Sequence, residues 1–154
     1  PETMWSAFWT QSPTIGARFE PEWCGIESDI MEYFHVGKAS TGNIMSGYGK
    51  QYRKEGRVNY DLNDTEDGWH YFGMNWQPEG YTFYYNGKEV SRADKNVSHV
   101  PQFILLTTEI KGYRSVKTKA NDDENAKPMP FEIQDDFVDD AFIVDFVRVF
   151  DKVR

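Results

Sequence analysis

Short runs of β-branched and aromatic residues, separated by Gly, Pro, Asn or Asp, dominate the pattern of hydrophobic and polar positions along this chain. Such runs are typical of β-strands. No stretch keeps apolar residues at helical spacing over three turns. The pattern therefore predicts an all-β chain, with strands over residues 4–9, 26–34, 69–76, 81–90, 101–110 and 141–150.

Turn and loop signals lie between these runs. Asn86-Gly87 predicts a β-hairpin, because both residues tolerate the positive φ of a type I′ turn. Loops are predicted over 10–23, 35–67 and 114–136, the last being polar and Pro-containing. Several short strands with turns between them indicate a sandwich or barrel. With no internal repeat and no linker in the sequence, residues 1–154 are predicted to form one domain.

Composition narrows the classes of partner. Aromatic residues make up 16% of the chain, which suits either stacking on sugar rings or an aromatic-rich β core. The net charge of −8 and the lack of a long Lys/Arg run argue against nucleic acid. No apolar run is long enough to cross a membrane. Cys24 is the single cysteine, which excludes a disulfide framework and a cysteine-based zinc site within this chain.

The segment CGIESDIMEYF, residues 24–34, carries the most specific chemistry, because Glu27, Asp29 and Glu32 fall within six residues of a predicted strand. Like charges at this spacing are unfavourable unless they are protonated, paired or used in chemistry. Strict alternation places Glu27 and Asp29 on one face and Glu32 on the other. A one-residue β-bulge near Ile30–Met31 would return Glu32 to the face of the other two acids.

Such a bulge would bring the carboxylates of Glu27 and Glu32 within reach of one substrate. Their Cα atoms would lie ~13 Å apart, leaving ~5 Å between the carboxylates, the spacing of a retaining glycosidase. Asp29 could share a proton with a neighbouring Glu and separate the pKa values of the pair. The alternative is an acidic strand face in water, which the apolar residues flanking the segment make less favoured.

The motif GIESDIME resembles the catalytic signature of glycoside hydrolase family 16, whose members include laminarinases, lichenases, agarases, porphyranases and κ-carrageenases. MWSAFWTQSP is similar to the Trp-containing strand that precedes the signature in that family. DGWHYFGMNWQPEGYTFYYNGKEV resembles the family's long hairpin, and VPQFILLTTEI and AFIVDFVRVFDKV resemble its last two strands. Together these segments cover most of the chain in the family's order.

The resemblance implies a concanavalin-like β-jelly-roll sandwich that hydrolyses a β-linked polysaccharide internally, with retention and without a cofactor. It makes Glu27 the nucleophile, Asp29 the assisting carboxylate and Glu32 the general acid/base. It also implies a set of substrate-binding residues. For these the alternatives are a Trp in the core and a hydrogen-bonded structural His. The set consists of Trp5, Trp9, Trp69, His70 and Glu109.

Two departures from the family pattern qualify these expectations. Family members begin with several strands that this sequence lacks, so we expect the C-terminal portion of a catalytic domain or a short variant, with a further N-terminal segment or a partner chain completing the sandwich. Residues 36–68 contain no His, where many relatives carry one. The family often holds a structural Ca²⁺, for which Asp145 matches one ligand, the others lying in the N-terminal region.

Substrate identity stays open at the level of sequence. A β-1,3- or mixed-linkage glucan is preferred, because the net charge of −8 disfavours a sulfated polymer. The alternatives are a red-algal galactan (agar, porphyran or carrageenan), or a carbohydrate-binding fragment without activity. A polymeric substrate cannot enter a cell, so we expect a secreted, cell-surface or periplasmic protein.

Overall fold

The computed structural model describes residues 4–17, 20–47, 50, 52–110 and 141–151. Within these ranges the chain forms eight strands and one four-residue helix, and no helix there has both the length and the apolar character that a membrane-spanning helix requires. The elements in chain order are β1 (Met4–Gln11), α1 (Pro21–Cys24), β2 (Glu27–His35), β3 (Lys38–Met45), β4 (Arg53–Asp61), β5 (Phe72–Gln77), β6 (Gly80–Tyr85), β7 (Lys88–Ala93) and β8 (Phe103–Ile110).

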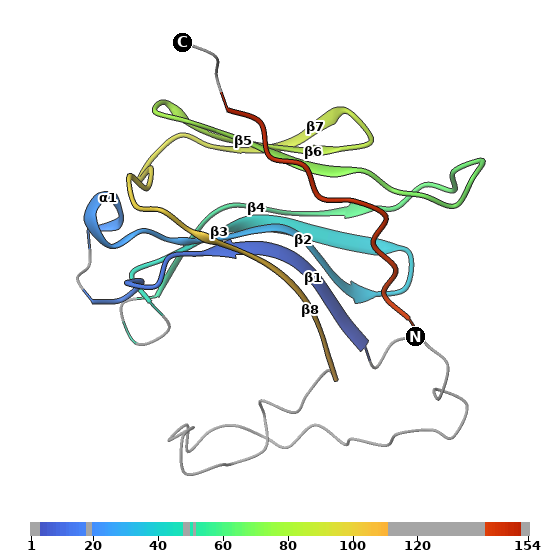
Figure 1. Ribbon diagram of the computed structural model, residues 1–154, viewed down its shortest axis with the longest axis horizontal. Coiled ribbons are helices and arrows are strands. Elements are labelled where there is room, and N and C mark those ends of the chain that lie inside the picture. Colours follow the sequence, from blue (N-terminus) through green and yellow to red (C-terminus); the bar gives the residue numbers. More distant parts are fainter. Residues whose placement is uncertain (1–3, 18–19, 48–49, 51, 111–140, 152–154) are drawn as a thin grey trace.

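The strands form two antiparallel sheets that lie face to face as two layers (Figure 1). The larger sheet has the order β4-β3-β2-β1-β8, and the smaller has the order β5-β6-β7. This arrangement confirms the predicted all-β sandwich. The helix α1 lies at one end of the larger sheet and begins with a proline in its first turn. Gly25 caps its C-terminus, with a φ of 74° that favours glycine.

The predicted hairpin is confirmed. Asn86 and Gly87 connect β6 to β7 with φ values of 48° and 76°, as a type I′ turn requires at both positions. The backbone N–H of Asn86 donates to the carbonyl of Tyr71, and the Asn86 side-chain oxygen accepts from the N–H of Tyr71, each at 2.8 Å. The turn is therefore tied to the segment that leads into β5.

The hydrophobic core lies between the two sheets and draws on both. Tyr81 and Phe83 of β6 are almost fully buried and meet Ile26, which precedes β2, and Met45 of β3. Side-chain packing is incomplete near β1 and β8, where a cavity of about 800 Å³ lies between these strands and residues 141–147. The smaller sheet packs chiefly on β2, β3 and β4.

Three expectations about elements need correction. The region 35–67, predicted as loop, contains β3 and β4, and the strand expected at 69–76 begins at Phe72. The strand β3, KASTGNIM, is small and polar, so it lacks the β-branched and aromatic signal that marks an ordinary strand. The predicted loop 10–23 contains the end of β1 and the helix α1. The predicted excursion 114–136 lies outside the described residues.

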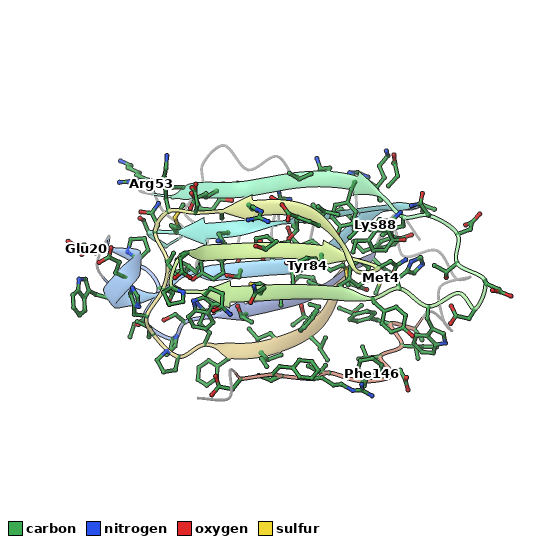
Figure 2. The ribbon with its side chains drawn as sticks, turned by 90° about the horizontal axis from the view of Figure 1, so that it is seen from above. Met4, Glu20, Arg53, Tyr84, Lys88 and Phe146 are labelled. Atoms are coloured by element: carbon green, nitrogen blue, oxygen red, sulfur yellow. The ribbon has the colours of Figure 1, made fainter. Side chains whose placement is uncertain are left out.

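The prediction of a strand at 141–150 is also wrong for the described residues 141–151, which form no paired strand. This segment runs along the side of the sandwich, on the opposite side from Arg53 of β4 (Figure 2). Several of its apolar side chains are exposed, including Val149 at 75% and Phe150 at 85%. High β-propensity becomes a strand only where a neighbouring edge pairs with the segment, and the described residues 141–151 are not assigned to a strand.

Candidate active site

The acidic strand β2 contains the predicted bulge. On one side Trp9 pairs with Asp29 while Phe8 pairs with Met31, so one residue of β2 has no counterpart in β1. On the other side Asp29 pairs with Gly42 and Glu32 with Ser40, which again leaves one extra residue in β2. Both neighbouring strands therefore place the extra residue at Ile30–Met31, as predicted.

The bulge brings Glu27, Asp29 and Glu32 to one face of the larger sheet. Ile26 belongs to the core between the sheets, so alternation directs Glu27 and Asp29 to the opposite face, and the extra residue returns Glu32 to it. The three residues are only 8%, 3% and 5% exposed. They are therefore neighbours in a largely dry environment, and the alternative of a solvated strand face does not describe them.

Hydrogen bonds from neighbouring strands fix two of the carboxylates. Gln11 of β1 donates from Nε2 to Oε2 of Glu27 at 3.3 Å. Oε2 of Glu32 accepts from Nη1 of Arg57 at 2.9 Å and from Oγ of Ser40 at 3.3 Å. Nη2 of Arg57 also lies 3.2 Å from the Ser40 hydroxyl, to which it donates. Glu32 is thus held by a connected arrangement of a serine and an arginine.

Burial and charge alter the acidity of two of these groups. Burial, followed by the neighbouring charges of Glu32 and Glu27, raises the pKa of Asp29 well above its usual value, and a hydrogen bond with Glu27 acts in the same direction. Burial also raises the pKa of Glu32, although the ion pair with Arg57 and the Ser40 hydroxyl oppose the increase. Both groups therefore keep a proton at higher pH than an exposed carboxylate does.

Aromatic side chains predicted to contact sugar lie on the same face. Trp9 stands beside Asp29 in the register and donates from Nε1 to Oγ1 of Thr107 at 3.0 Å. Alternation along β1 places Trp5 on the face of Trp9, opposite Glu109 of β8. Trp5 also packs on Phe34 with ring centroids 4.7 Å apart. The structure brings Trp5, Trp9 and Glu109 to the acidic face, and their contact with sugar stays a prediction.

Trp69 and His70 are not brought to the carboxylates. Both line the cavity between the sheets together with Phe8 and Met31, which lie on the face opposite to Trp9 and Asp29. Nδ1 of His70 lies 3.0 Å from the Tyr85 hydroxyl, and the two rings stack. This geometry matches the alternative of a hydrogen-bonded structural histidine, and it gives no support to a role for either residue in sugar binding.

Sequence reasoning missed Arg57 and Ser40, because both fall in the region predicted to be loop. The available signal was the pair Gly42 and Gly56, since isolated glycines within strands often mark a bulge or a close backbone approach. Reading those glycines as bulge positions would have predicted strands in this region, without showing which strand lies next to the acidic one.

The calcium prediction stays a prediction. Asp145 lies in the described segment 141–151, but no group of three or more His, Cys, Asp or Glu side chains suited to a metal gathers anywhere in the described ranges. Ca²⁺ requires six or more oxygen ligands. A role of Asp145 in binding Ca²⁺ therefore stays a prediction.

Both the sequence and the fold are similar to those of known proteins. The sequence profile of the family described as Glycosyl hydrolases family 16 matches residues 2–128. This match confirms the resemblance drawn from the acidic motif and the flanking strands. A search of curated proteins finds no significant match.

Solved structures show the same fold. The catalytic domain of an endo-1,3-β-glucanase (laminarinase) from Thermotoga petrophila RKU-1 is similar with a TM-score of 0.56 and 24% identity, over 72% of this chain and 48% of that chain. A family 16 protein for mixed-linkage glucan from Bacteroides ovatus, in complex with a G4G4G3G product, gives 0.53 and 18%, over 71% and 50%.

A κ-carrageenase from Pseudoalteromonas carrageenovora, in complex with an oligotetrasaccharide of κ-carrageenan, gives a TM-score of 0.53 and 21% identity, over 73% of this chain and 46% of that chain. This chain therefore spans about half the length of these solved structures. At these identities the likeness establishes the jelly-roll fold.

Proposed function

Because the chain belongs to family 16 of the glycosyl hydrolases, we propose that it hydrolyses a β-linked polysaccharide internally, with retention of anomeric configuration. The observation that carries this proposal is the bulge in β2, which places Glu27, Asp29 and Glu32 together on one buried face. A retaining hydrolase needs two carboxyl groups close enough to act on one sugar. Trp5 and Trp9 on the same face offer flat apolar surfaces for sugar rings.

In the proposed reaction, Glu32 carries a proton and donates it to the leaving glycosidic oxygen while Glu27 attacks the anomeric carbon. The carbon–oxygen bond breaks and a glycosyl ester forms on Glu27. Glu32, now ionised, accepts a proton from water, and the resulting attack releases Glu27. The raised pKa of Glu32 supports its role as the acid. Asp29, hydrogen-bonded to Glu27, shares a proton within the group.

A β-1,3- or mixed-linkage glucan is the preferred substrate in this proposal. A net charge of −8 disfavours a densely sulfated polymer, although the local charge of the binding face weighs more than the total. Because a polymeric glucan cannot enter a cell, the proposal includes a secreted, cell-surface or periplasmic location.

The first prediction tests the two glutamates separately. Glu27→Ala and Glu32→Ala should each lower the rate of release of reducing ends from laminarin by ~100-fold or more, since each removes a group that takes part in bond cleavage. Glu79→Ala, an exposed position at the β5–β6 turn, is the matched control and should keep the wild-type rate. Full activity in either test variant would rule out the assigned roles.

Added azide distinguishes the two roles. In Glu27→Ala it can attack the free anomeric face and give the α-glycosyl azide. In Glu32→Ala it can attack the glycosyl-enzyme and give the β-glycosyl azide. An aryl glycoside with a good leaving group supplies the glycosyl unit in both cases, because its departure needs little acid assistance. The same azide anomer from both variants would contradict the assignment.

A second candidate function is carbohydrate binding without hydrolysis. It is favoured by Trp5 and Trp9 on the acidic face, whose flat apolar surfaces could stack on sugar rings without any bond cleavage. Incubation with laminarin, mixed-linkage glucan, agar and porphyran separates the two candidates. Retarded migration in a polysaccharide gel without new reducing ends would support binding alone, and new ends on the glucans would support the hydrolase.

A further inference from the structure

Another bulge lies in β4, two strands away from the bulge at Ile30–Met31. Thr41 pairs with Val58 and Asn43 pairs with Glu55, so two residues of β4 stand opposite one residue of β3. The two are Gly56 and Arg57, and the residue opposite them is Gly42. Gly56 has a φ of 64°, as the first position of a glycine-type bulge requires. The extra residue changes the direction of the Arg57 side chain relative to regular alternation.

Two glycines make this bulge sterically feasible. A Cβ atom on Gly42 would lie 2.9 Å from Cα of Arg57, and a Cβ atom on Gly56 would lie 2.9 Å from the carbonyl oxygen of Arg92 in β7. Both distances are too short for a real side chain. The Ser91 hydroxyl of β7 donates a hydrogen bond to the carbonyl of Gly56. The bulge is therefore fixed between β3 and the second sheet.

The side chain of Arg57 is directed to Glu32. It donates to Oε2 of Glu32 at 2.9 Å and to Ser40 at 3.2 Å, and its guanidinium carbon lies 5.9 Å from the centroid of Phe34. Its side chain is 28% exposed. A charge-assisted hydrogen bond is stronger than one between neutral groups, and a buried environment of low dielectric strengthens it further. The bulges in β2 and β4 therefore direct the carboxylate of Glu32 and the guanidinium of Arg57 toward each other across β3.

We infer that Arg57 is a positioning residue for Glu32, which holds the carboxyl group in one orientation and favours its ionised form. This inference rests on the proposed hydrolysis, in which Glu32 alternates between acid and base. In the first step Glu32 must carry a proton, and burial favours that state. In the second step it must accept one from water, and Arg57 favours the ionised state that does so.

The charged groups around Glu32 support a specific role for this arginine. Glu27 and Asp29 share its strand; the charge of Glu27 favours the protonated form of Glu32, whereas the cation Arg57 opposes it. Of the other neighbours, β1 presents Ala7 and β3 presents Ser40, neither of which titrates. Along the part of the chain that the structure describes, Arg57 is the one cation in an ion pair with Glu32.

The experiment compares Arg57→Gln and Arg57→Lys with the control Arg92→Gln. Arg92 is an exposed arginine of β7 whose ion pair with Glu89 lies on the second sheet, so its replacement matches the chemistry without touching the acidic face. Two measurements are made: a ¹³C NMR titration of the Glu32 carboxyl, assigned with Glu32→Gln, and the pH profile of kcat/KM on laminarin and on an activated aryl β-glucoside.

In Arg57→Gln the Glu32 carboxyl should titrate at higher pH than in the wild type, and the basic limb of kcat/KM should move in the same direction. At its optimum, kcat/KM on laminarin should fall about 10- to 100-fold, whereas the aryl substrate, which needs little acid assistance, should lose no more than about 3-fold. Arg57→Lys keeps the positive charge but lacks the planar guanidinium group. Its Glu32 titration and its kcat/KM on laminarin should therefore lie between those of the wild type and Arg57→Gln. Arg92→Gln should match the wild type.

Two results would overturn the inference: an unchanged titration of Glu32 in Arg57→Gln, or equal losses on the two substrates, which would indicate a general disturbance of the face. Thermal unfolding identifies a variant that has lost its fold, in which case Arg57→Lys supplies the titration. If the wild type hydrolyses nothing, the proposed function fails, and the titration alone then decides whether Arg57 controls the protonation of Glu32.

Discussion

At the scale of single residues, burying the carboxyl group of Asp29 on the acidic face makes the stability of the fold depend on pH. Asp29 is buried between two glutamates, and its pKa is raised well above the usual range. The unfolded chain has no such environment, so the folded state binds a proton that the unfolded state releases. Stability then decreases as the pH rises from the unfolded pKa of Asp29 toward its folded pKa.

Asp29→Asn tests this linkage, because an amide resembles the protonated acid and cannot ionise. The variant should unfold at a higher temperature than the wild type near neutral pH, and the difference should shrink as the pH falls toward 3.8, the ordinary pKa of Asp. Melting curves from pH 3.5 to 7.5 measure the effect. Asp64→Asn, at an exposed position, should show no such trend. A constant difference over this range would contradict the assigned pKa direction.

The sequence was informative about residues whose position depends on local geometry. Glu27, Asp29 and Glu32 could be brought together by one bulge, a local event that spacing alone makes recognisable. Arg57 could not be found in this way, because its meeting with Glu32 depends on a second bulge and on the order of strands in the sheet. The sequence left His70 open between sugar binding and a structural role, because its partner Tyr85 cannot be identified from spacing along the chain.

At the scale of elements, turns were predicted more securely than strands. Asn-Gly allows few backbone conformations, so the hairpin at Asn86-Gly87 follows from its dipeptide alone. Strands depend on partners. The polar strand β3 forms because β2 and β4 enclose it, whereas the apolar segment 141–151 has no paired strand among the described residues. The hydrophobic pattern alone therefore predicts neither the strand β3 nor the lack of a paired strand at residues 141–151.

Gly87→Ala tests the hairpin. With φ at 76°, an alanine there should lower the free energy of unfolding by about 1–2 kcal/mol, the penalty of a left-handed conformation for a residue with a Cβ. Gly73→Ala in β5 is the matched control, because its φ is not positive and nothing lies within 4 Å of the added Cβ. It should be neutral or mildly stabilising. Urea unfolding compares the two, and equal effects would contradict the proposed turn geometry.

At the scale of the whole molecule, the two sheets are unequal in width. Among the described residues, the larger sheet ends at β8, whose side chains Phe103, Ile104 and Leu106 are exposed, and the cavity of about 800 Å³ lies on the same side. Exposed apolar surface next to an open strand edge is unusual for a monomer. That a further segment or a partner chain completes the sandwich stays a prediction.

The anomeric configuration of the first product tests the central claim most directly, since the claim is that Glu27 and Glu32 act on one sugar at the spacing of a double displacement. Laminarin is mixed with the protein in D₂O, and the anomeric protons of new reducing ends are followed by ¹H NMR before mutarotation. The account predicts that the β-anomer appears first and the α-anomer grows later. The α-anomer appearing first would show inversion and contradict it.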